Sequence, residues 1–302
     1  MNPFDTPERC ALRESCGRFV RREIVPHLDD WERDGEIPRS LHKAAAAAGL
    51  LAVGYPEEVG GSGGDGIDST VVTESFIEAG ASSGLLAALF THAIALPHIV
   101  AAGAAELVDR FVRPTLAGEQ IGSLAVTEPD GGSDVARLRC RAVRDGDHYL
   151  VNGAKTFITS GVRADFVTTA VRTGAAPSGT PRTPEGRRGI SLLVIEKDTP
   201  GLTVSRKLDK MGWRCSDTAE LAFDDARVPA RNLVGAENGG FALLMRHFVG
   251  ERLGLATHAH SIAARCLALT VEYVRARSTF GGPLIGRQVV QHRLVQMRQR
   301  VE

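Results

Sequence analysis

One stretch of the chain combines residue types that are suited to binding an anion. The sequence LAVTEPDGGSDVA, at residues 124–136, begins with the alternating apolar residues of a strand and becomes small and polar after its proline. Gly131 and Gly132 permit a positive φ, so successive main-chain N–H groups there can converge on an anion. Thr127 and Ser133 add hydroxyl groups. An ordinary turn explains the same residues equally well.

Two other patterns are weaker signals for a site. Residues 61–66, GSGGDG, match the dinucleotide fingerprint G-x-G-x-x-G, but that motif needs a preceding strand and a βαβ unit. Helical segments flank it here, so we expect a flexible loop between helices. His258 and His260 are two residues apart and face different directions on a helix, and no CxxC pair occurs among the five cysteines. We therefore predict no metal site.

The elements that position these residues change along the chain. Residues 1–120 favour helices, with a start at Thr6-Pro7-Glu8, where proline takes the first helical position. Further helices are expected at 68–79, 83–101 and 105–117. We predict an N-terminal helical domain over residues 1–120.

Residues 121–232 are rich in short runs of β-branched residues and predict a central antiparallel β-domain. Asp145-Gly146 and Asn152-Gly153 separate such runs, which is a strong hairpin signal. The Pro/Gly/Arg-rich residues 174–189 are expected to form a loop. From 233 to 302 a helical bundle is expected, with a long helix from Gly240 and a break at 280–286. This order predicts an α+β multi-domain fold and argues against a doubly wound α/β fold.

Composition excludes several classes of protein. The chain has 302 residues, so two or three domains are expected. Its 36 basic and 36 acidic residues balance, which gives no electrostatic case for binding nucleic acid or an anionic membrane. The sequence contains no uninterrupted apolar run of about 18 residues, so no transmembrane helix is expected. The N-terminus lacks the apolar region of a signal peptide, and the scattered cysteines favour a reducing, cytoplasmic location.

Four segments together resemble a known family. VTEPDGGSDV at 126–135, NGAKTFITSG at 152–161, KMGWRCSDT at 210–218 and RSTFGGPL at 277–284 resemble, in order and spacing, the signatures of the acyl-CoA dehydrogenases. The resemblance implies an N-terminal helical domain, a central β-domain and a C-terminal helical bundle, which is incomplete here. It also implies FAD as cofactor, acyl-CoA as substrate and a homotetramer.

The resemblance assigns roles to individual residues. It implies that the flavin is lined by Leu124, Val126, Thr127, Ser133, Phe157, Ile158 and Thr159. A neighbouring subunit's FAD would be reached by Arg277, Phe280 and Gln288, and the substrate would be contacted by Ser133, Phe241 and Arg252. Trp213, Arg214 and Asp217 match a family signature, and we expect them to hold the β-domain against the next helix.

The implied reaction needs a carboxylate that removes the α-proton of the thioester. Many members of the family carry this base beyond the position of residue 302, and a minority carry it on the long helix, where this chain has Glu251. Helical spacing predicts an apolar stripe with Arg252 inside it and Glu251 near its edge; the stripe comprises Phe241, Leu244, Met245, Phe248, Leu255 and Ala256. A partly desolvated carboxyl has a raised pKa and suits a general base. A structural pairing of Glu251 with His247 or an arginine explains its position equally well.

The resemblance implies FAD-dependent α,β-dehydrogenation of an acyl-CoA to a trans-2-enoyl-CoA, with electrons passed to an electron-transfer flavoprotein. Two alternatives stay open: a non-catalytic or half-site subunit that needs a heteromeric partner, and an acyl-CoA oxidase-like flavoenzyme. The last helix still runs at Glu302, so the chain is expected to be truncated inside its bundle. We expect this end to expose four apolar residues, Val289, Val290, Leu294 and Met297.

Overall fold

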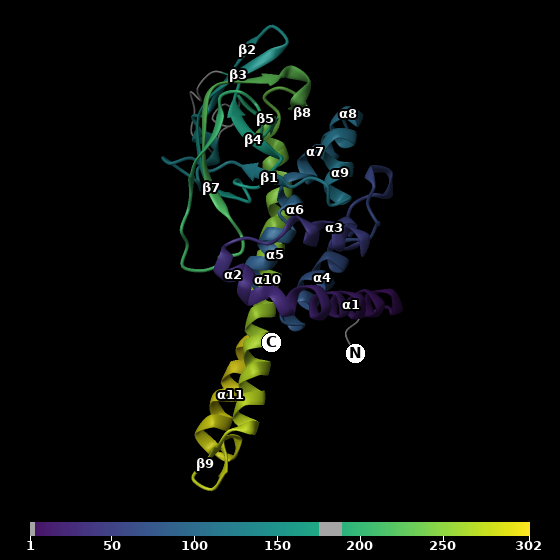
Figure 1. The fold of residues 1–302 in the computed structure, drawn as a ribbon, viewed down its shortest axis with the longest axis vertical. Coiled ribbons are helices and arrows are strands. Elements are labelled where there is room, and N and C mark those ends of the chain that lie inside the picture. Colours follow the sequence, from purple (N-terminus) through teal and green to yellow (C-terminus); the bar gives the residue numbers. More distant parts are fainter. Residues whose placement is uncertain (1–3, 175–188) are drawn as a thin grey trace.

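The computed structural model describes residues 4–174 and 189–302, so the predicted loop at 174–189 lies almost wholly outside the described residues. Helices come first, a β-sheet follows and two helices end the chain (Figure 1). The three hydrophobic clusters follow this order. One lies among the first helices, one between helices and sheet, and one on the other side of the sheet. The predicted α+β class is confirmed.

The N-terminal part consists of short helices whose starts are readable from the sequence. Their bounds are α1 Pro7–Phe19, α2 Leu28–Asp34, α3 Arg39–Ala47, α4 Gly66–Glu78, α5 Ser83–Leu89, α6 His92–Ala95, α7 Pro97–Ala102, α8 Ala105–Leu107 and α9 Arg113–Leu116. Thr6 caps α1 by accepting the N–H of Arg9, as predicted. The GSGGDG segment is a loop that leads into α4, where Asp65 and Asp68 form a capping box. The helix predicted at 83–101 is broken into α5, α6 and α7, with Pro97 in the first turn of α7.

The central part is one sheet in the order β6-β7-β3-β2-β4-β5-β8, with β1 beside β4. The strands are β1 Gly122–Ala125, β2 Arg141–Asp145, β3 His148–Thr159, β4 Phe166–Arg172, β5 Ile190–Glu196, β6 Leu202–Lys207, β7 Thr218–Pro229 and β8 Leu233–Val234. Most neighbours pair antiparallel, as predicted. The exceptions are β1, which pairs parallel with β4 from Gly122↔Phe166 to Ala125↔Thr169, and one parallel pair between β2 and β4.

One of the two predicted hairpins is correct. Asp145 and Gly146 lie at the turn between β2 and β3, where Gly146 has φ 60°. Asn152 and Gly153 do not form a turn, because both lie inside β3 at a register shift against β7. Gly153 has φ 144°, and a Cβ there would lie 2.8 Å from Cα of Cys140. This glycine serves a β-bulge and the close approach of Cys140, the residue just before β2.

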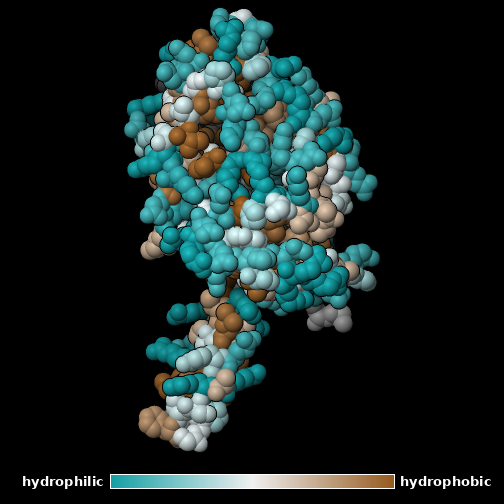
Figure 2. Space-filling view, in the orientation of Figure 1, coloured by the Kyte–Doolittle hydropathy of each residue, from teal (hydrophilic) through white to brown (hydrophobic). Residues whose placement is uncertain are grey.

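The C-terminal part is a long helix and a shorter one. Helix α10, Gly240–Ala276, starts at the sheet, packs against α4 and then leaves the body of the molecule together with α11, Gln288–Val301 (Figure 1). The small strands β9, Ser278–Thr279, and β10, Gly282–Pro283, form the tip. Figure 2 shows apolar side chains among polar ones on this projecting pair.

The predicted exposure of the last helix holds in part. Val289 is 68% exposed. Val290, Leu294 and Met297 are half-buried, because α11 packs along α10. Among the described residues, no single helix is long and apolar enough to cross a membrane. One pair, Ser83–Leu89 with His92–Ala102, passes that test of length and composition only when its two bent parts are taken together.

Candidate active site

The anion-binding stretch predicted from the sequence begins with the last two residues of β1, Leu124 and Ala125, and continues beside the end of β3. Leu124, Val126 and Thr127 are half-buried, and Ser133 is exposed. The carbonyl of Thr127 accepts the N–H of Thr156 at 3.0 Å, which fixes the stretch against β3. Both segments that the family resemblance places at the flavin therefore lie together.

The main chain of this stretch differs from the predicted anion nest. Glu128 and Gly131 exchange two main-chain hydrogen bonds, at 3.0 and 3.1 Å, so the N–H of Gly131 is used inside the turn. Neither Gly131 nor Gly132 adopts the left-handed conformation. A Cβ at Gly132 would lie 3.2 Å from the methyl group of Thr127. The absence of a side chain at Gly132 thus leaves the surface beside Thr127 uncovered.

A bulge in β3 turns one aromatic ring outward. The register between β3 and β7 shifts between Lys155 and Ile158, and Phe157 has φ 59° and is 68% exposed. A non-glycine residue in this conformation is strained, and such strain gathers at functional sites. Ile158 instead points into the sheet's core, so its side chain is directed away from the surface where its predicted ligand would lie. Thr159 is half-buried, and its carbonyl accepts the Ser123 hydroxyl at 2.6 Å.

The second part of the site is the face of α10 that carries Glu251. His247 lies four residues before Glu251 and His258 seven residues after it, so the three side chains share one face of the helix. Each has a buried polar atom without a hydrogen-bond partner: Nε2 of both histidines and Oε1 of Glu251. Burial raises the pKa of Glu251 to about 7, against the opposing effect of Arg252. An unpaired carboxyl with this pKa can accept a proton near neutral pH.

The sequence pattern assigned the faces of α10 only in part correctly. Arg252, expected inside the apolar stripe, is exposed, whereas Glu251 is half-buried. Leu255 is 60% exposed, and Ala256 is exposed as well. Since α10 still contacts the body at His258, the physical reason is the face of the helix and not its length: the part of its surface that carries Arg252, Leu255 and Ala256 has no packing partner among the described residues of this chain. Phe241, a predicted substrate contact near the start of α10, is half-buried.

Two ring contacts bound the Glu251 face. His98 of α7 meets His247 edge to face, with centroids 4.9 Å apart. The ring of Trp213 lies 6.0 Å from that of His258. Trp213 also comes so close to α5 that a Cβ at Gly84 would lie 2.7 Å from its Cα. Trp213 of the 210–218 signature therefore lies between α5 and the next helix, α10.

The three residues predicted to reach a neighbouring FAD lie far from the other two parts. Arg277, Phe280 and Gln288 are exposed at the tip of the α10–α11 pair, around the β9 label in Figure 1, at the opposite end of the molecule from the sheet. Phe280 is 97% exposed, and Arg287 stacks over its ring at 5.5 Å. The structure therefore does not bring these residues to the 124–133 segment of the same chain.

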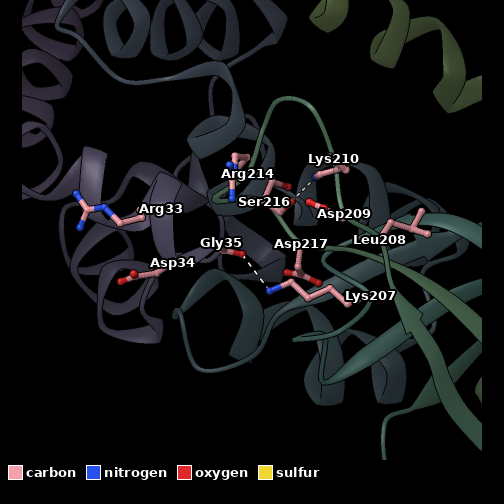
Figure 3. Close-up of a pocket in the computed structure, with 10 residues that line it drawn as sticks. All are labelled: Arg33, Asp34, Gly35, Lys207, Leu208, Asp209, Lys210, Arg214, Ser216 and Asp217. Atoms are coloured by element: carbon pink, nitrogen blue, oxygen red, sulfur yellow. Dashed lines mark hydrogen bonds between the residues drawn. The ribbon is translucent and has the colours of Figure 1, made fainter.

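A charged surface pocket of about 280 Å³ lies between α2 and the 207–217 segment (Figure 3). Lys210 there donates to the hydroxyl of Thr218 at 2.8 Å, and Lys207 donates to the carbonyl of Gly35 at 3.3 Å. Its lining includes none of the predicted flavin or substrate residues. Within residues 4–174 and 189–302, no group of three His, Cys, Asp or Glu side chains is placed to hold a metal ion.

Sequence reasoning missed a buried ion pair beneath the flavin segment. Lys155 Nζ lies 2.9 Å from Oε1 of Glu128, and both side chains are buried. The available signal was a lysine inside the β-branched run KTFIT, where its strand neighbours predict a buried position. His98 was also missed, because a single histidine in a helical segment has no distinctive pattern.

The fold of helices, a sheet and a long helix, with an open segment beside a bulged aromatic residue and a half-buried glutamate, is that of a class of flavin-dependent oxidoreductases. The chain belongs to the acyl-CoA dehydrogenase family, which is FAD-dependent. The family's N-terminal domain matches residues 6–119, its middle domain residues 123–226 and its C-terminal domain residues 238–302.

Individual relatives agree with this assignment. The long-chain specific acyl-CoA dehydrogenase of Mus musculus mitochondria is 37% identical over 96% of this chain and 66% of its own length. A probable acyl-CoA dehydrogenase of Bacillus subtilis is 35% identical over 100% of this chain and 77% of its own. The crystal structure of a probable acyl CoA dehydrogenase from Mycobacterium abscessus is 62% identical, with a TM-score of 0.94 over 98% of this chain and 76% of that one. This chain thus spans about two thirds to three quarters of the length of these relatives.

Proposed function

We propose that this chain binds FAD and catalyses the α,β-dehydrogenation of an acyl-CoA thioester, with Glu251 as the catalytic base. The observation that carries the proposal is the Glu251 carboxyl, which is half-buried on α10, has an oxygen without a partner and has a pKa of about 7. A carboxyl kept in this state costs stability, and such costs are typical of functional sites.

The cofactor assignment is supported by the surface beside Thr127. The open position at Gly132 and the outward ring of Phe157 offer one face to a flat ring system, and Ser133 adds an exposed hydroxyl. Bound FAD would supply the acceptor for the hydride that leaves the β-carbon. Glu251 would take the α-proton, so that the substrate loses one proton and one hydride and gains a carbon–carbon double bond.

The chain's own residues would keep this proton transfer selective. Burial keeps the carboxyl of Glu251 less acidic than a free glutamate, which matches its basicity to a weakly acidic α-proton. Trp213 and His98 fix the helix on both sides of Glu251 through their contacts with His258 and His247. A base held in one place accelerates proton transfer because less motion is needed to reach the reactive geometry.

The test is anaerobic bleaching of the flavin by a panel of acyl-CoAs, with Glu251→Gln compared against Glu272→Gln. Glu272 lies on the same helix and is exposed. We expect Glu251→Gln to retain FAD and to slow bleaching by about 10²–10⁴-fold, whereas Glu272→Gln keeps the unmodified rate. Bleaching at the unmodified rate in Glu251→Gln would remove it as the base. If the unmodified chain binds no FAD or bleaches with none of the substrates, the proposal fails.

The remaining assignments belong to this proposal as well. We infer three domains, at 1–120, 121–232 and 233–302, a cytoplasmic location, electron transfer to an electron-transfer flavoprotein and assembly into a tetramer. The place of Arg277, Phe280 and Gln288 at the far tip of α10 and α11 supports a flavin site shared between subunits, in a homotetramer or with a heteromeric partner alike. If these residues bind FAD, they must bind it in another subunit. An oxidase is distinguished by oxygen consumption with acyl-CoA.

A further inference from the structure

A buried lysine and a buried glutamate lie directly beneath the flavin segment. The Lys155 side chain is 0% exposed and that of Glu128 is 8% exposed. Lys155 Nζ donates to Oε1 of Glu128 and to the carbonyl of Val126, both at 2.9 Å. Burying two charges is costly, and a pair of this kind adds little net stability relative to apolar residues of the same size. Its presence therefore calls for a second role.

The carboxylate of Glu128 closes the segment into a ring. Its Oε2 accepts the N–H of Arg139 at 2.6 Å, and its Oε1 accepts the N–H of Cys140 at 2.8 Å. The residues between Glu128 and Arg139, which include Ser133, thus form a loop whose two ends are held by one side chain. Charge-assisted hydrogen bonds of this kind are short and directional, so the ends of the loop have little freedom.

A second buried cation holds the far side of the same loop. Arg172 of β4 is 6% exposed and donates to the carbonyls of Ala136 at 2.7 Å and Leu138 at 3.0 Å. Together, Lys155 and Arg172 bind main-chain carbonyls on both sides of the turn. The loop has a Glu128–Gly131 bridge and a short 3₁₀ turn at Val135–Arg137, and side chains from the sheet fix these two pieces in place.

Lys155 also connects this loop to the other predicted flavin contact. It lies two residues before Phe157, at the start of the bulge in β3. The next residue, Thr156, donates its N–H to the carbonyl of Thr127. One ion pair therefore sets the position of Val126 and Thr127 relative to the outward ring of Phe157.

We propose that Lys155 and Glu128 are positioning residues for the flavin: their buried ion pair holds the 126–140 loop and the Phe157 bulge at the separation that the isoalloxazine ring requires. The inference rests on the proposed binding of FAD. Neither side chain contacts the cofactor. The pair acts through the main chain of the residues that do, and it forms the site before FAD arrives.

The β-domain contains a matched control for this proposal. Arg163 and Asp217 form a second buried pair, with 8% and 0% exposed side chains and a separation of 2.9 Å. Asp217 also accepts a main-chain N–H, that of Val162, at 2.8 Å. This pair matches the first in burial and geometry. It holds Val162 and Arg163, which follow β3, and it does not contact the 126–140 loop.

The experiment compares Glu128→Gln with Asp217→Asn, because both keep the shape of the side chain and remove its charge. FAD is titrated into each apoprotein, the visible spectrum of the bound flavin is recorded, and amide hydrogen exchange is followed at Arg139 and Cys140 without cofactor. We expect Glu128→Gln to speed exchange at these two amides at least tenfold, to weaken FAD binding at least tenfold and to change the flavin spectrum. Asp217→Asn should lower the melting temperature by a similar amount and leave the other three readouts unchanged.

Several outcomes would overturn the proposal. Equal losses of FAD affinity in Glu128→Gln and Asp217→Asn would show a general effect on the fold, and unchanged affinity and spectrum in Glu128→Gln would show that the pair does not position the flavin. If Glu128→Gln does not fold, the double variant Lys155→Met/Glu128→Gln removes both charges, and it must fold yet bind FAD at least tenfold more weakly. Absence of FAD binding by the unmodified chain would overturn the proposed function itself. Binding without a difference between variants would overturn only this inference.

Discussion

His98 and His247 join α7 to the first turns of α10 through an edge-to-face contact, with ring centroids 4.9 Å apart and an angle of 89° between the planes. Burial lowers the pKa of His98 to about 4, and burial also lowers the pKa of His247. Both rings are therefore neutral near pH 7. Since Glu251 follows His247 by one helical turn, this contact fixes α10 at the residue that we propose as the base.

The low pKa of His98 predicts a loss of stability in weak acid. An unfolded histidine binds a proton near pH 6.5, whereas His98 in the fold resists protonation until about pH 4. The free energy of unfolding should therefore fall as the pH drops through this window, by about 1.4 kcal/mol per pH unit for each such group. His42 and His92 contribute in the same direction, with pKa values of about 3 and about 4 after burial.

This loss is measured by urea unfolding between pH 7 and pH 4.5. His98→Leu should reduce the slope of the unfolding free energy against pH by about 1.4 kcal/mol per pH unit, which is the contribution of one proton. His260→Gln is the control, because His260 is exposed, and it should leave this slope unchanged. Identical slopes for His98→Leu and the unmodified chain would contradict the assignment.

The raised pKa of Glu251 predicts that activity increases with pH. Only the deprotonated carboxyl accepts a proton, so the rate of flavin bleaching should rise about tenfold per pH unit below pH 7 and level off above it. The effect on stability has the opposite sign. The folded chain keeps this proton to higher pH than the unfolded chain, so stability is lost as the pH rises from about 4.5 to about 7.

Two measurements check these signs. The first is the anaerobic bleaching rate between pH 5.5 and pH 9, where a flat profile would exclude a base with a pKa near 7. The second is the free energy of unfolding at pH 8, which should be higher in Glu251→Gln than in the unmodified chain by about 1 kcal/mol, with allowance for partial exposure. The same comparison at pH 5 should show little difference.

The sequence was sufficient where local chemistry decides the structure. The cap at Thr6, the long helix from Gly240 and the turn at Gly146 follow from rules that act over a few residues. It was insufficient where distant segments meet. The stripe on α10 predicts one continuous buried face, but the helix passes different neighbours along its length, so Arg252 is exposed and Glu251 is half-buried.

Part of the site was predictable for the same reason. Thr127 and Phe157 lie in motifs that identify the family, and the structure brings their segments together through Thr156. The pairing of Lys155 with Glu128 was not predictable, because it depends on a contact between residues 27 positions apart in the chain. Local patterns indicate that a residue is buried, but not which partner neutralises it.

The bulge at Gly153 offers a test of how closely β3 approaches the chain before β2. Gly153→Ala places a Cβ 2.8 Å from Cα of Cys140 at φ 144°, so we expect a loss of about 2–4 kcal/mol in the free energy of unfolding. Gly146→Ala is the control, since a Cβ there meets nothing within 4 Å and only its φ of 60° is unfavourable. Its expected cost is about 1–2 kcal/mol. Equal losses in thermal or urea unfolding would argue against the close approach.

The exposed tip of α10 and α11 predicts a coupling between cofactor binding and assembly. Arg277 is exposed there, and within the described residues its guanidinium makes no ion pair, so it is free to bind a pyrophosphate through two parallel hydrogen bonds. In its own chain it lies at the opposite end of the molecule from the flavin segment (Figure 1).

If it binds FAD in a neighbouring subunit, Arg277→Ala should lower FAD affinity by about tenfold or more and also shift the assembly towards monomers. Arg275→Ala is the matched control, because Arg275 is exposed in the last turn of the same helix. FAD occupancy and sedimentation velocity are measured on the same samples. Monomers of Arg277→Ala that retain full FAD occupancy would contradict the coupling, because they would show that one chain completes the flavin site without its neighbour.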